Sequence, residues 1–463
     1  MSNEKENDVD MDSIHLFDYL KKEIPVDELR DFDSPKRIVS IDFVKGFAII
    51  FIILAHTAGA WLNSSWIFIY GIVFSFLDIL GPSLFIFLSA LSVVFSIKRK
   101  KNSLSSKVIR NRILNRGIII IVIAIIFNIF AFEFTIEGYP FPLNLWGWNI
   151  LMFIGFSQIF SLYALKIGKM ARAVLGAVII FTSDPIRQFL FEGKEAGNLF
   201  ITFLHYIIVS PSPMTPLLPW ISICFISTIF GEYLYDAMIM GKKQDYIVLF
   251  RTFLYWGLFF VLMGIFLGRY SYAPATFYSP ANDLIVGSLP LNEYPHIGLL
   301  YDMNSQIIIP EIRYPGMWEF LVRGRAPNMI YNLGAALLII AISFYFIDIK
   351  NKNNTFISML IYYGKVSLSL FLIHYTFIML FIWYFDIVIF PFIWLGYVGF
   401  MGFLMYVWNE FFNGVGSPEW LMVQIGRIGQ KTGKTVMKEM QIIEDELKGT
   451  IHKLKRHEHD SEN

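Results

Sequence analysis

The sequence predicts an all-α protein: a polytopic integral membrane bundle of about ten transmembrane helices, with both termini in the cytoplasm. Of its 463 residues, 56% are hydrophobic and only 16% are charged, whereas a typical soluble domain carries about 25% charged residues. Apolar blocks of about 20 residues alternate with short charged clusters, as in multi-pass membrane proteins. We therefore expect the lipid bilayer as a partner of the chain, and no nucleic acid.

Ten apolar blocks are long enough to be membrane spans, although the fifth is short. Gly81 and Pro82 interrupt the second block and predict a kink there. We expect residues 196–210 to extend the fifth span or to lie at the membrane interface. The predicted spans are 43–62, 67–97, 113–133, 148–166, 171–183, 217–239, 248–268, 327–348, 364–385 and 388–411.

Basic residues occur in every second loop between these spans. The loop 98–116 carries eight Lys or Arg residues and no acidic residue. Further basic clusters follow the fourth, sixth and eighth spans, whereas the loop 134–147 contains no Lys or Arg. Because cytoplasmic loops are enriched in Lys and Arg, this alternation places both termini inside. It also favours ten spans, or another even number.

Composition divides the chain into three regions. Residues 1–36 are polar, with 11 acidic against 5 basic residues, and lack the features of a cleaved signal peptide. Residues 37–417 form the multi-pass domain, which includes a long outer loop at 269–326. In residues 418–463, apolar residues recur at helical spacing among lysines, which predicts an amphipathic cytoplasmic helix.

The sequence contains no recognisable metal or nucleotide motif. Cys224 is the only cysteine, so it can form neither an intrachain disulfide nor a cysteine-based metal site. We expect no metal and no tightly bound cofactor.

The first span carries three ionisable residues on one stripe. Asp42, Lys45 and His56 lie in an otherwise apolar segment, where ionisable groups are costly and usually functional. At 100° per residue, Lys45 projects within roughly 20° of His56 and Asp42 within roughly 40°. The spacing therefore predicts a polar stripe that runs from the membrane edge toward the middle of the bundle.

His56 has three interpretations. A neutral imidazole can take a proton from a hydroxyl or amine, or it can itself attack an acyl donor. It can also simply hydrogen-bond to a neighbouring helix. Asp42 and Lys45 can orient a cytoplasmic donor, or they can form an i,i+3 ion pair at the start of the helix.

Other candidate residues lie in later spans. Ser367 and His374 are seven residues apart in the ninth span and share a helix face. The serine can pack helices together, and the histidine can be structural or functional. Arg323 and Arg325 flank the outer end of the eighth span, where they can be solvated or can bind an anionic acceptor.

Six motifs resemble, in order, those of polytopic membrane acyltransferases. The similarity is to the heparan-α-glucosaminide N-acetyltransferase catalytic-domain family, and the last motif is similar to that of a related membrane family. Lys45 stands where the family usually has Arg, so the charge is kept but the bidentate fork is lost. The motifs are Arg37–Gly46 with His56, Gly81–Ser89, Gly147–Gly155, Pro216–Trp220, Ser367–His374 and Gly416–Trp420.

The resemblance covers about residues 37–425 and implies a function. It implies transfer of an acetyl or other acyl group from cytoplasmic acyl-CoA, as co-substrate, to a hydroxyl or amine of a glycan or lipid-linked sugar on the far side. It assigns His56 as the catalytic histidine and Asp42 as its helper. We expect the donor route to include Arg37, Lys45, Ser367 and His374. Two alternatives remain: a transporter or flippase that uses the same polar cavity, and a structural or signalling membrane protein.

Overall fold

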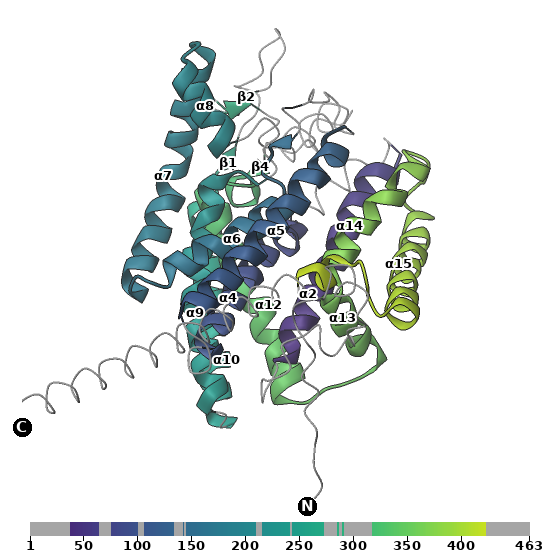
Figure 1. Ribbon diagram of the computed structural model, residues 1–463. Coiled ribbons are helices and arrows are strands. Elements are labelled where there is room, and N and C mark those ends of the chain that lie inside the picture. Colours follow the sequence, from purple (N-terminus) through teal and green to yellow (C-terminus); the bar gives the residue numbers. More distant parts are fainter. Residues whose placement is uncertain are drawn as a thin grey trace, which may run out of the picture.

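The protein forms a bundle of long helices (Figure 1). The computed structural model describes residues 38–63, 76–100, 106–133, 142, 145–209, 215–240, 243–272, 285–286, 289–290 and 317–422. Its strands are only two residues long and form two antiparallel pairs: β1 (Ser271–Tyr272) with β4 (Met317–Trp318), and β2 (Ile285–Val286) with β3 (Leu289–Pro290). The all-α class is therefore confirmed.

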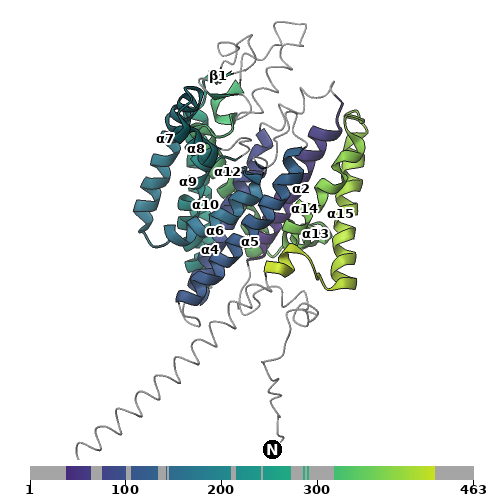
Figure 2. The same cartoon turned by 45° about the horizontal axis from the view of Figure 1, so that its top comes forward.

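In both views of the molecule, α7 and α15 lie on opposite sides of the bundle, with α2, α4, α5 and α6 between them (Figures 1 and 2). The helices are α2 (Val39–Trp61), α4 (Pro82–Lys100), α5 (Ser106–Glu133), α6 (Ile150–Ala164), α7 (Lys169–Glu195), α8 (Leu199–Ile208), α9 (Leu217–Met240), α10 (Lys243–Leu267), α12 (Ala326–Phe344), α13 (Thr355–Lys365), α14 (Ser367–Ile378) and α15 (Phe390–Phe412).

Many of these helices can cross a membrane. Within the described residues, seven are long and apolar enough, and an eighth span results if the bent pair formed by α13 and residues 367–381 counts as one. The helices α4, α6 and α8 are apolar but shorter. Each of the ten predicted spans overlaps one of the helices. The number of crossings and the cytoplasmic position of the termini stay predictions.

The fifth span differs from its prediction. It was expected at 171–183, but α7 continues through Pro185 to Glu195. Asp184 and Pro185 have the appearance of a span end, yet the Asp184 carboxylate is neutralised by Arg325 at 2.8 Å. Residues 199–208 form the separate helix α8, which packs against α7 after a turn at Gly197 (φ 74°). These residues therefore do not extend the fifth span.

The ninth span is also divided. The prediction was one helix over 364–385, but the chain bends by 86° between α13 and α14. Val366 leaves the helical conformation at this point (φ −111°, ψ 24°). The helix α13, which the sequence did not predict, packs along α2. The bend therefore starts α14 beside α2, the helix that carries His56.

The helices α2 and α13 touch backbone to backbone. A Cβ atom added at Gly46 would lie 1.8 Å from the Leu360 carbonyl oxygen, and one added at Gly364 would lie 1.8 Å from the Asp42 carbonyl oxygen. Small residues at a membrane helix crossing permit such close approach. This contact fixes the position of the segment that carries Asp42 and Lys45.

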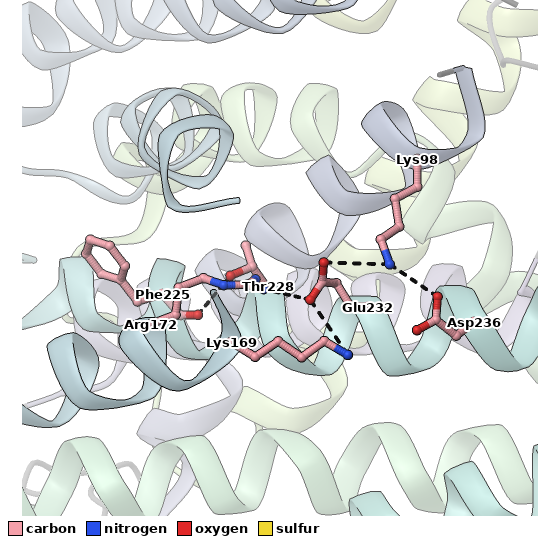
Figure 3. A network of polar contacts seen from close by, with 7 residues as sticks. All are labelled: Lys98, Lys169, Arg172, Phe225, Thr228, Glu232 and Asp236. Atoms are coloured by element: carbon pink, nitrogen blue, oxygen red, sulfur yellow. Dashed lines mark hydrogen bonds and ion pairs between the residues drawn. The ribbon is translucent and has the colours of Figure 1, made fainter. Parts of the chain in front are cut away.

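Two basic loops meet at one end of the bundle. Lys98 at the end of α4, and Lys169 and Arg172 at the start of α7, all lie close to the Glu232 carboxylate of α9, at 3.6, 3.9 and 2.6 Å (Figure 3). Asp236 also binds Lys98, at 3.2 Å. The loops after the second and fourth predicted spans thus share one end of the molecule, as two loops on the same side of a membrane must.

Several predicted features lie outside the described residues. These are the N-terminal segment 1–36, Arg37, the tail from residue 423 onward, and most of the loop 269–326.

Candidate active site

Two histidines that are 318 residues apart in the sequence meet between α2 and α14. His56 Nδ1 lies 2.8 Å from His374 Nε2, and the two rings are within 11° of parallel. His374 is fully buried, and His56 is partly buried. The structure therefore combines two separately predicted histidines into one hydrogen-bonded pair.

One backbone carbonyl determines which ring nitrogen of each histidine carries the proton. His374 Nδ1 lies 3.2 Å from the Leu370 carbonyl oxygen, which can only accept a hydrogen bond, so Nδ1 carries the proton. In neutral His374 the lone pair is then on Nε2, and His56 must donate from Nδ1. The remaining lone pair of neutral His56 is on Nε2, where the Tyr375 hydroxyl lies 3.3 Å away. The pair thus presents His56 Nε2 as a proton acceptor or nucleophile.

Aromatic rings enclose the histidine pair. Phe371 contacts both imidazoles, with ring centroids 6.3 Å from His56 and 5.5 Å from His374. Phe127 of α5 packs against Tyr375 at 4.9 Å. From α15, the Tyr397 hydroxyl donates to the His374 carbonyl oxygen at 2.5 Å. These contacts fix the rings and limit the access of water to them.

A polar cavity lies near the pair, although neither histidine lines it. It has a volume of about 210 Å³ and extends to the end of the bundle where α2 begins, hereafter the Asp42 end. Phe371 lines it, so one side chain touches the cavity and both histidines. The polar residues that line the cavity are Asp42, Lys45, Ser89, Ser92, Arg116, Gln158, Lys365, Ser367 and Glu419.

Hydrogen bonds order two walls of the polar cavity. Gln158 Nε2 donates to Ser89 Oγ at 2.6 Å, and Ser89 Oγ also lies 2.8 Å from Ser157 Oγ. On the opposite wall, the Glu419 carboxylate accepts from the backbone N–H groups of Leu368 and Ser369 and from the Ser369 hydroxyl. Burial raises the pKa of the Glu419 carboxyl, against these hydrogen bonds, which lower it.

Two arginines lie at the other end of the bundle, hereafter the Arg323 end. Arg323 lies on the turn just before α12 and is partly buried. Arg325 is ion-paired with Glu319 at 2.6 Å, as well as with Asp184. The charge of Arg325 is therefore already balanced within the protein.

The turn that carries Arg323 is held from α12. The Gly324 N–H donates to Asn328 Oδ1 at 3.3 Å, and Asn328 Nδ2 donates to the Phe320 carbonyl at 2.9 Å. Gly324 has φ +79°, a conformation that glycine adopts without steric cost. Asn332 continues the chain of hydrogen bonds to Ser83 at the start of α4.

The structure thus groups most of the predicted site residues. Asp42, Lys45 and Ser367 line the polar cavity, whereas His56 and His374 do not line it but contact Phe371, which does. Sequence reasoning missed several neighbours, although two of them had a signal. Tyr375 directly follows His374, and Glu419 lies in the Gly416–Trp420 motif, to which no role was assigned. The other residues missed are Arg116, Lys365 and Phe371.

The comparison with protein families bears on this arrangement. The model for "Heparan-alpha-glucosaminide N-acetyltransferase, catalytic" matches residues 37–257, slightly less than half of the chain. Residues 37–257 are thus similar to the catalytic domain of this acetyltransferase family. No curated protein and no solved structure matches the chain.

The chain is therefore a multi-pass membrane protein with an acetyltransferase catalytic domain. The segment that matches the acetyltransferase family includes Asp42, Lys45 and His56, whereas His374 and Glu419 lie beyond it. The C-terminal half of the chain thus contributes one of the two paired histidines. Within the described residues, no group of three His, Cys, Asp or Glu side chains is placed to hold a metal ion.

Proposed function

We propose that this protein transfers an acetyl or similar acyl group from acyl-CoA, through the membrane domain, to a hydroxyl or amine of a glycan or lipid-linked sugar on the far side. The observation that carries the proposal is the hydrogen-bonded pair of His56 and His374, which contacts Phe371 in the lining of a polar cavity. We assign residues 37–417 to one catalytic domain because His56 and His374, from its two ends, form a single site.

In the proposed reaction, His56 Nε2 takes the proton of the acceptor O–H or N–H while the acceptor attacks the thioester carbonyl carbon. The carbon–sulfur bond then breaks, and the proton passes from the imidazolium to the leaving sulfur. His374 continues to accept from His56 Nδ1, so it fixes the orientation of the ring and stabilises its developing positive charge. In a second version, His56 Nε2 attacks the thioester carbonyl carbon, the carbon–sulfur bond breaks and coenzyme A leaves as the thiolate. The acceptor then takes the acyl group from His56, and its proton neutralises the thiolate.

The polar cavity suits the donor. Lys45, Arg116 and Lys365 line it, and cations of this kind bind phosphate groups such as those of coenzyme A. Phe371 offers an apolar surface between the cavity and the histidines, along which the acyl arm can reach His56. Asp42 also lines the cavity, where its carboxylate can orient the donor or a neighbouring cation.

The acceptor is expected from the Arg323 end. The positive charge of Arg323 at this end is expected to attract an acceptor that carries a negative group. Arg325, which is already paired with two carboxylates, is expected to hold the turn rather than to bind the acceptor.

Radiolabelled acetyl-CoA tests the proposal with protein in proteoliposomes and a panel of glycans and lipid-linked sugars. We expect label to appear in at least one acceptor, and acetyl-CoA to bind when no acceptor is present. A transporter or flippase has no reason to bind coenzyme A. Neither binding nor transfer across the panel would therefore overturn the proposal and favour that alternative.

A further inference from the structure

The helix α14 starts without support from the helix before it. The bend of 86° at Val366 separates α14 from α13, and the first N–H groups of a helix have no partners within that helix. Two of these groups, on Leu368 and Ser369, donate to Glu419 Oε1 at 3.1 and 3.0 Å. The Ser369 hydroxyl donates to Glu419 Oε2. A carboxylate from the segment after α15 therefore caps α14.

This cap is close to the histidine pair. Ser369 and His374 are five residues apart, about 7.5 Å along the helix axis. The same short helix supplies the Leu370 carbonyl, which fixes the proton on His374 Nδ1. A shift of the first turn of α14 would therefore change both the position of His374 and its hydrogen bond to His56.

We propose that Glu419 is a positioning residue for the acyl transfer: its carboxylate fixes the start of α14 and so keeps His374 against His56. This inference rests on the proposed function, because it assigns Glu419 a part in the reaction through His374. It also couples the C-terminal segment of the chain, which begins after α15, to the reacting group on α2.

The chain offers a matched control. Asp348, in the π-helical turn that directly follows α12, caps α2 in the same way, since its carboxylate accepts from the Val39 and Ser40 N–H groups at 3.0 and 3.1 Å. However, Val39 is 17 residues from His56, about 25 Å along the helix. The two caps are alike in chemistry, but the Glu419 cap on α14 lies close to His374, whereas the Asp348 cap on α2 lies far from His56.

Turnover is compared in wild type, Glu419→Gln, Ser369→Ala and Asp348→Asn at equal amounts of folded protein. We expect Glu419→Gln to lower kcat about tenfold, which corresponds to about 1.4 kcal/mol and is within the usual cost of a lost helix cap, and Ser369→Ala to lower it less. The KM for acetyl-CoA should change less than about twofold, and Asp348→Asn should retain wild-type kcat. Wild-type kcat in Glu419→Gln, or an equal loss in Asp348→Asn, would overturn the inference.

A double-mutant cycle with His374→Ala separates positioning from direct contact with the donor. If Glu419 acts through His374, Glu419→Gln should lower kcat less than about twofold further in the His374→Ala protein. A persistent tenfold loss, or a loss confined to the KM for acetyl-CoA, would instead assign Glu419 to the donor cavity and contradict the proposal.

Hydrogen exchange tests the positioning claim independently of activity. Glu419→Gln should lose protection in residues 367–378, whereas Asp348→Asn should lose it at the start of α2. Unchanged protection of α14 would overturn the inference even if the enzyme is active. If the wild type transfers no acyl group while α14 loses protection as expected, the proposed function fails and the capping role of Glu419 stands.

Discussion

His56 and His374 form a hydrogen-bonded pair of 2.8 Å between Nδ1 and Nε2 across two helices. The Leu370 carbonyl fixes the proton on the distant nitrogen of His374, so the remaining lone pair of neutral His56 is on Nε2, where the Tyr375 hydroxyl lies 3.3 Å away. In the proposed function, the two rings therefore have different roles: His56 acts on the reacting groups, and His374 orients His56.

His374→Ala should lower turnover by about 10- to 100-fold, less than removal of His56 itself. Removal of a group that orients a functional side chain typically lowers activity by about 10- to 100-fold. Steady-state kinetics with labelled acetyl-CoA measure the loss. His205→Ala is the control, because His205 is also buried but lies on α8, away from the pair. An equal loss in both variants would show that the effect is only structural.

Gly364→Ala should lower the free energy of unfolding by about 1–3 kcal/mol, the usual cost of overpacking. Its Cβ would lie 1.8 Å from the Asp42 carbonyl oxygen, so α13 must move away from α2. Gly396→Ala on α15 is the control, since nothing lies within 4 Å of its added Cβ. Thermal unfolding in detergent compares the two, and equal melting temperatures would contradict the close helix contact.

Lys45→Ala should raise the KM for acetyl-CoA about tenfold, since hydrogen bonds to charged groups are worth about 1.5–3 kcal/mol. The effect should be absent with acetyl-pantetheine, which lacks the nucleotide phosphates. Lys166→Ala is the control, because Lys166 packs over the Tyr163 ring and does not line the cavity. The same rise in KM with both donors would count against phosphate binding at Lys45.

Labelling of single cysteines should show that the two ends of α12 face opposite sides of the membrane. On a Cys224→Ala background, Tyr270→Cys in the 269–326 loop should react with an impermeant reagent in intact cells. Lys352→Cys should react only after permeabilisation. Both residues are exposed, so labelling depends only on which side of the membrane each residue faces. Labelling of Lys352→Cys from outside would contradict the orientation given by the basic loops.

Helical periodicity placed Asp42, Lys45 and His56 on one stripe of α2, and their shared role stays a prediction. Asp42 and Lys45 line the polar cavity, and His56 contacts Phe371, which lines it too. Hydropathy was likewise sufficient to place all ten spans on helices, because lipid requires long apolar segments whose backbone groups are satisfied internally.

Tertiary contacts could not be predicted in this way. The sequence gives no distance between His56 and His374, whose meeting depends on the bend at Val366. The role of Glu419 depends on the return of the chain after α15 to the start of α14. The length of α7 was underestimated because the partner that neutralises Asp184 is Arg325, which is distant in sequence.

The most direct test of the account is acetyl transfer by His56→Ala. If His56 Nε2 is the general base, turnover should fall by roughly 10²–10⁴-fold, while acetyl-CoA binding stays nearly intact because the cations that line the polar cavity are unchanged. If His56 carries the acyl group instead, wild-type protein should become labelled by acetyl-CoA without acceptor, and His56→Ala should not. Full turnover in the His56→Ala protein would contradict both versions.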